Sequence, residues 1–99
     1  MLDTTLECSD TADLLRLARG VEAALGRLFG RASYAPLPRD DGSVVLHWSA
    51  GLLCHESYSL EVRDGEAVVY DDFRHVPLLR EDSVASALRL FIVTVEALS

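Results

Sequence analysis

The longest hydrophobic pattern in the chain predicts an amphipathic helix over residues 11–29. Apolar side chains recur there at intervals of three, four and seven, which gathers them on one face of a helix. These positions are Leu14, Leu17, Ala18, Val21, Ala24, Leu25, Leu28 and Phe29. Asp10 suits the N-cap, and Gly30 suits the position after the last turn. Residues 2–8 alternate between apolar and polar, which predicts either an extra N-terminal edge strand or a frayed leader.

Alternation with a period of two predicts a three-stranded antiparallel β-meander in the middle of the chain. The expected strands lie at 44–49, 54–62 and 67–71. Asp64-Gly65, between the last two strands, is a strong signal for a two-residue hairpin. Pairing outward from this turn sets Val62 opposite Ala67 and Leu60 opposite Val69, and it gives the sheet one apolar, core-directed face. The opposite face carries mixed side chains and is expected to be semi-exposed.

A second helix is predicted near the C-terminus, after connectors at 30–42 and 72–81 that contain prolines and turn residues. Asp82 suits the N-cap of this helix. Its expected core face consists of Val84, Leu88, Phe91, Ile92, Val95 and Leu98. β-branched residues crowd the segment 90–95, so a strand there is the alternative. We therefore expect a single α+β domain over residues 1–99, with an N-terminal helix, the meander, and a C-terminal helix packed beside the first on one sheet face.

The predicted C-terminal helix is also apolar on a second face. Leu90, Val93 and Ala97 lie on that face, opposite the expected core side. A helix that is apolar nearly all round has to be covered on two sides, which a chain of this size hardly achieves alone. We therefore expect Leu90, Val93 and Ala97 to form the interface of a homodimer.

The charge balance narrows the range of possible partners. The chain has 99 residues, with Lys+Arg 9 against Asp+Glu 16 and a net charge of −7. Nucleic acids and anionic membranes bind cationic surfaces, so we expect neither as a partner. The acidity fits a protein partner with a basic surface. Every cation is an arginine and the chain lacks Lys, Asn and Gln, which indicates a GC-rich bacterial genome. Because no basic leader or long apolar run is visible, we expect a cytoplasmic location.

The residues that could carry catalysis form no recognised pattern. Cys54 and His55 are neighbours in a predicted strand, so their side chains point to opposite faces and do not make a nucleophile–base pair. Glu56 and Asp71 share the inward phase of the sheet, but a general acid–base pair needs a pocket that so short a chain seldom provides. The sequence therefore predicts a protein that is not an enzyme.

The histidines of the predicted sheet leave one alternative open. The metal-ligand spacings HxH, HExxH and CxxC are absent, so we expect no metal and no other cofactor. His47, His55 and Asp72 nevertheless share a polar sheet face if the strand register permits it. A small enzyme, or a domain that binds a ligand or metal on this face, is therefore the alternative.

The mixed sheet face is the predicted partner-binding surface, because an exposed tyrosine among acidic residues is common at protein interfaces. The expected contact residues are Glu61, Glu66, Val68, Tyr70 and Asp72. We expect a non-catalytic protein-binding module, of the inhibitor or immunity type or like a small secretion chaperone. The helix-then-meander order over residues 11–72 and the acidity are similar to the type III secretion chaperones, although the C-terminal half is shorter here. The resemblance implies a protein partner and a dimer.

Overall fold

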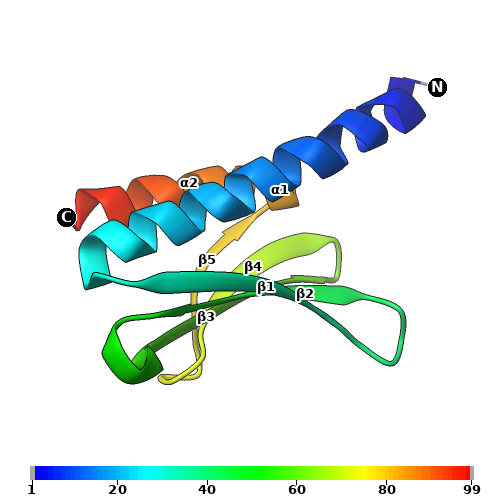
Figure 1. Ribbon diagram of the computed structural model, residues 1–99. Helices are drawn as coiled ribbons and strands as arrows, with labels where there is room; N and C mark the ends of the chain where they lie inside the picture. Colours follow the sequence, from blue (N-terminus) through cyan, green and yellow to red (C-terminus); the bar gives the residue numbers. More distant parts are fainter. Residues whose placement is uncertain (1, 99) are drawn as a thin grey trace.

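Two helices lie side by side on one face of a five-stranded antiparallel sheet (Figure 1). The computed structural model describes residues 2–98. The elements are α1 (Leu2–Phe29), β1 (Ala32–Pro38), β2 (Val44–Ala50), the short 3₁₀ helix η1 (Leu52–Cys54), β3 (Glu56–Arg63), β4 (Glu66–Asp71), β5 (Val76–Glu81) and α2 (Val84–Ala97). The strands follow one another in the sheet in chain order. The predicted α+β class, with a helix first and last around an antiparallel sheet, is confirmed.

The prediction of three strands is wrong, because the sheet has five. β1 lies within the predicted connector 30–42, and β5 lies within the predicted connector 72–81. Pro36, Pro38 and Pro77 misled the interpretation, since proline excludes helix and donates no hydrogen bond to a sheet. An edge strand tolerates it, and β1 and β5 are the two edges of the sheet. The pairing of β4 with β5 also shifts its register next to Pro77.

The helices begin at different residues from those predicted. α1 starts at Leu2 rather than at residue 11, so residues 2–8 form neither an edge strand nor a leader but the first turns of this helix. Residues 90–95 are helical, so the strand alternative is wrong. The Ser83 side chain caps α2 by accepting an amide hydrogen bond at 3.1 Å, which leaves Asp82 just outside the helix.

The central hairpin follows its predicted register. Leu60 lies opposite Val69, as pairing outward from the turn requires. Asp64 and Gly65 have φ angles of 54° and 80°, the positive values that a two-residue type I′ turn needs. The local turn signal therefore fixed both the position of this hairpin and the face to which each side chain points.

Trp48, in β2, joins the sheet to both helices. Its side chain is fully buried, and its indole Nε1 donates a 2.9 Å hydrogen bond to the carbonyl oxygen of Ala18 in α1. Its ring meets the Phe91 ring of α2 edge-on, with 5.5 Å between centroids. Gly20 allows the helices to approach, because a Cβ at this position would lie 3.0 Å from Ile92 Cδ1. These contacts hold the helix layer over the middle of the sheet.

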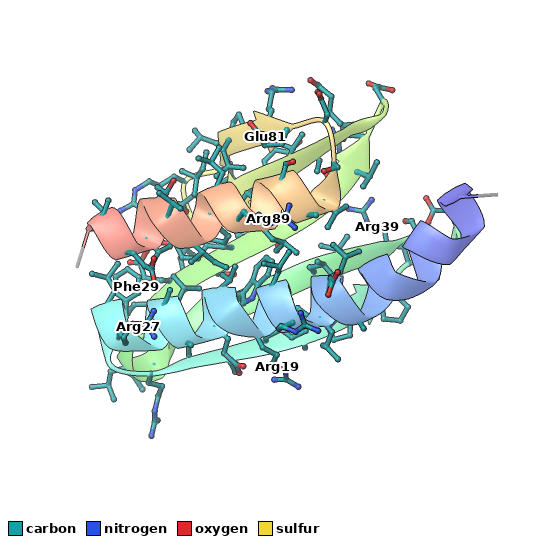
Figure 2. All side chains as sticks on the ribbon, turned by 90° about the horizontal axis from the view of Figure 1, so that it is seen from above. Arg19, Arg27, Phe29, Arg39, Glu81 and Arg89 are labelled. Atoms are coloured by element: carbon teal, nitrogen blue, oxygen red, sulfur yellow. The ribbon has the colours of Figure 1, made fainter. Side chains whose placement is uncertain are left out.

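Because consecutive strands are antiparallel, the loops that join them lie alternately at two opposite ends of the sheet. One end, here named the hairpin end, contains the β1–β2 loop at 39–43, the β3–β4 turn at 64–65, the β5–α2 junction at 82–83 and the N-terminal half of α1 (Figure 1). α1 continues past the first turn of α2 at this end (Figure 2). Among the described residues, no helix has both the length and the hydropathy to cross a bilayer.

Candidate functional site

The hairpin end carries acidic side chains that lack a cationic partner within 4 Å in the described part of the chain. They are Asp40, Asp41, Asp64, Glu81 and Asp82. The hydroxyl and the amide of Ser43 donate hydrogen bonds of 2.6 and 2.9 Å to Asp41 and hold the pKa of that carboxyl below its usual range. Uncompensated negative charge is therefore concentrated at the hairpin end.

The acidic side chains predicted to contact a partner on the strands are mostly paired within the protein. Glu61 is buried and forms ion pairs with Arg39 of the β1–β2 loop and, at 2.9 Å, with Arg63. Glu66 is exposed and lies 3.7 Å from Arg80 on the neighbouring strand β5. The arginines cancel much of the field that these carboxylates would otherwise project into solvent. The strands therefore present less free acid than the sequence suggests.

The apolar part of the predicted contact surface is only partly accessible. Val68 is buried rather than semi-exposed, because the long side chains of Glu61 and Arg80 flank it from β3 and β5. Tyr70 is partly exposed and lines an open hollow of about 350 Å³ together with Ser59 and His75. On this face the structure thus brings Glu61, Val68 and Tyr70 together, but only Tyr70 of these reaches solvent to a substantial degree.

Asp72 lies at the centre of a polar network on the same face. Its Oδ2 accepts hydrogen bonds from the hydroxyls of Ser57 at 2.9 Å and Ser59 at 2.7 Å. His47 Nε2 lies 2.9 Å from Ser57 Oγ and 3.7 Å from Asp72 Oδ2. Since the single hydroxyl proton of Ser57 points to Asp72, His47 has to donate to Ser57 rather than remove its proton. The network therefore orders these side chains and does not activate a serine nucleophile.

The ligands predicted for a metal or catalytic site on this face do not all converge. His47 and Asp72 come together, whereas His55 is exposed at the end of η1 and, among the described contacts, meets neither of them. No group of three His, Cys, Asp or Glu side chains among the described residues is placed to hold a metal ion. A zinc site needs three or four such ligands. The side chain of Cys54 lies outside the described part of the structure.

Glu56 and Asp71 share one arginine. Arg74 Nη1 lies 2.5 Å from Asp71 and 4.0 Å from Glu56. Burial favours the neutral form of Asp71, but hydrogen bonds from the amides of Arg74 and Phe73 and from the guanidinium outweigh it, so the pKa of Asp71 is lowered. Burial and a 2.8 Å hydrogen bond to Glu56 raise the pKa of Tyr58. An aspartate held ionised in this way is unsuited to act as a general acid.

An apolar groove at the hairpin end was not predicted. Its volume is about 580 Å³. It is lined by Ala12, Leu14, Leu15, Tyr34, Val44, Leu46, Leu60, Val62 and Val84. Val62 was expected to face the core, yet its side chain is 60% exposed. Its phase in β3 points it to the helix side of the sheet, where α2 has not yet begun. The sequence signal for the groove was therefore Val62, an apolar residue in the core-facing phase of its strand that neither helix covers.

The predicted dimer residues lie on the outer side of α2. Leu90 is 38% exposed, Val93 is 60% exposed, and Ala97 is also exposed. A second apolar groove of about 340 Å³ includes Leu90 itself, together with residues of α1 and β5 and with Leu98. This face carries little charge, since residues 83–98 contain only Arg89 and Glu96. The homodimer remains a prediction.

No protein-family model, curated protein or solved structure matches this chain. The similarity to type III secretion chaperones therefore rests only on the order of elements and on acidity.

Proposed function

We propose that this chain is a non-catalytic protein-binding module that covers a basic surface of a partner protein with its hairpin end. One observation carries this proposal: among the described residues, the carboxylates without a cationic partner within 4 Å are gathered at this end. They lie in the β1–β2 loop, in the β3–β4 turn, and at the end of β5 with its junction to α2, which are far apart in the sequence. Carboxylates that face an internal arginine contribute little attraction to a distant cation, so the free ones determine where a basic partner is drawn.

The short range of electrostatic forces in salt favours direct contact at this end. At physiological ionic strength the field of an exposed charge decays over about 8 Å, so a partner has to bring its cations close to the loops. Loops on a rigid sheet present such charges in a fixed pattern. An inhibitor or immunity-type protein and a secretion-chaperone-like protein both act by covering a partner in this way, without catalysis.

Affinity purification from the source cells tests this proposal. The tagged wild-type chain is compared with Asp40→Asn/Glu81→Gln, which removes two free acids at the hairpin end. The matched control is Glu22→Gln/Glu96→Gln, which removes two carboxylates paired with Arg19 and Arg27. Both variants change the net charge equally, and each removes one exposed and one partly exposed carboxylate.

The result expected is a basic protein that the wild type and the control retain and that rising salt releases. The purified partner should then bind Asp40→Asn/Glu81→Gln at least tenfold more weakly by calorimetry. Equal retention of this partner by the hairpin-end variant, or the capture of no basic protein, would contradict the proposal.

A second candidate function is a small-ligand site on the open sheet face. The convergence of His47, Ser57, Ser59 and Asp72 beside the hollow of about 350 Å³ favours it. NMR titration with zinc and with inorganic phosphate tests this candidate. Saturable shifts confined to these residues, and lost in His47→Ala, would support a ligand-binding role; shifts scattered over the surface would exclude it.

A further inference from the structure

We propose that the apolar groove at the hairpin end, named here the uncovered groove, binds a basic amphipathic helix of the partner. The groove is the surface lined by Ala12, Leu14, Leu15, Tyr34, Val44, Leu46, Leu60, Val62 and Val84. The inference deepens the proposed function, on which it rests, because it names the segment that the acidic end receives.

The uncovered groove is a part of the core surface on which no helix lies. Leu46 and Leu60 face each other across β2 and β3 on the helix side of the sheet, and Leu60 is buried. One alternation further along each strand, Val44 and Val62 point to the same side but are 50% and 60% exposed. α2 begins only at Val84, while α1 continues past it (Figure 2). The helix layer is therefore one element short at this end.

A helix is the element that fits this place. An extended segment on the face of a sheet, rather than at its edge, would leave its backbone N–H and C=O groups without partners against apolar side chains. A helix satisfies those groups internally and presents apolar side chains at intervals of three and four residues. The volume of about 580 Å³ lies in the range of pockets that bury several such side chains.

The charges around the uncovered groove specify the polar side of that helix. Three of the segments that line it, in α1, β3 and α2, adjoin a carboxylate in the sequence: Asp13 precedes Leu14, Asp64 follows Val62 by two residues, and Asp82 precedes Val84 by two. Within the part of the chain that the structure describes, only Asp13 of these three forms an ion pair, at 3.0 Å from Arg16. Lysine or arginine residues flanking the apolar stripe of the bound helix would therefore meet opposite charge.

The test uses a fluorescein-labelled probe peptide of about 18 residues, composed of Leu, Ala and Lys, with Leu at helical spacing. A second peptide has the same composition but alternates Leu and Lys as a strand would. A third replaces every Lys by Glu. Binding is measured by fluorescence anisotropy at low and physiological salt, and the contact residues are mapped by ¹⁵N–¹H NMR.

The variant Val44→Thr/Val62→Thr removes apolar surface from the groove while keeping β-branched side chains in the strands. The matched control is Leu37→Thr/Val76→Thr, at strand residues that are 46% and 43% exposed and lie outside the groove. Circular dichroism confirms that both variants fold. We expect the helical Lys peptide to bind the wild type and the control, and to bind Val44→Thr/Val62→Thr at least tenfold more weakly.

The outcomes separate this inference from the proposed function. Equal binding of the helical and the alternating peptide, or of the groove variant and the wild type, overturns the groove assignment. If the groove assignment fails in this way but the Lys peptides still bind Asp40→Asn/Glu81→Gln more weakly than the wild type, the acidic end attracts them through charge alone. The proposed function then survives. If no Lys peptide binds even at low salt, both fall. If light scattering shows a wild-type dimer that Val44→Thr/Val62→Thr converts to a monomer, a second copy occupies the groove and the inference is wrong.

Discussion

Replacing Glu61 by Gln is expected to destabilise the protein without weakening partner binding. The sequence placed Glu61 on the contact surface, but its carboxylate is buried and bridges Arg39 of the β1–β2 loop and Arg63 of its own strand. This side chain therefore ties the β1–β2 loop down onto the sheet and covers Val68, which lies opposite it on β4. A glutamine keeps the shape but loses the charge that both guanidinium groups need.

The magnitude follows from the two ion pairs. A hydrogen bond to a buried charged group contributes about 1.5–3 kcal/mol. The side chains of Arg39 and Arg63 are 45% and 63% exposed, so after the substitution their guanidinium groups return to water and the loss stays near the low end. We expect Glu61→Gln to lower the free energy of unfolding by about 2 kcal/mol, which for a domain of this size lowers Tm by about 10 °C.

The arginine variants give a sharper expectation. Arg39→Ala or Arg63→Ala alone should cost about 1 kcal/mol, because the other guanidinium still pairs with Glu61. The double variant leaves a buried carboxylate without a cation and should cost about 3 kcal/mol or more. The excess over the sum of the single variants is the signature of the shared carboxylate.

Urea unfolding, followed by circular dichroism and by the fluorescence of buried Trp48, measures these differences. Glu66→Gln is the control on the same face, since its carboxylate is exposed and lies 3.7 Å from Arg80; it should change stability by less than about 0.5 kcal/mol. A Glu61→Gln protein as stable as this control, or strictly additive arginine variants, would refute the reasoning.

Three further predictions test other parts of the fold. The pKa of Asp71 is lowered in the folded state, so the unfolded chain takes up the proton first as pH falls. Asp71→Asn should lose about 2 kcal/mol at pH 7, and its deficit against the wild type, measured by urea unfolding, should shrink below about pH 4. Gly26→Ala should raise the free energy of unfolding by about 0.5–1 kcal/mol because a Cβ there meets nothing closer than 3.9 Å; Gly20→Ala should gain less, since its Cβ lies 3.0 Å from Ile92. If the homodimer forms through α2, Val93→Asp should halve the mass measured by light scattering; an unchanged dimer would exclude this face.

The elements with strong local signals could be predicted from the sequence. The helical spacing of α1 over residues 11–29 and the Asp64-Gly65 turn each depend on neighbouring residues, so they could be recognised without the rest of the fold. β1 and β5 could not be recognised in this way, because their prolines are acceptable only on an edge strand. Whether a strand lies at an edge is a property of the whole sheet, which no local window contains.

For the candidate site, the sequence could predict only that its charge is negative, and not which residues carry that charge. The excess of acid was evident from composition, but the sequence does not show which carboxylate meets an arginine. Arg39 reaches Glu61 from 22 positions away, and Arg80 reaches Glu66 from a neighbouring strand that was not predicted. The carboxylates without a cationic partner therefore lie mainly in the loops at the hairpin end, and not along the strands as predicted. The uncovered groove was missed for a related reason, since Val62 has the phase of a core residue and only the late start of α2 exposes it.

Turn chemistry explains part of the acidic end, and this determines which residues can report on binding. Asp64 occupies a positive φ, and Asp41 accepts two hydrogen bonds from Ser43; asparagine would serve both roles, but the chain contains none. Asp82 adjoins the N-terminus of α2, where a negative charge is favourable. Asp40 and Glu81 have no such role: neither has a positive φ, and among the described contacts neither side chain forms a hydrogen bond or an ion pair. A loss of partner binding on neutralising these two residues, with stability unchanged, would therefore assign them to recognition, whereas the same loss at Asp41 or Asp64 would be confounded with the turns.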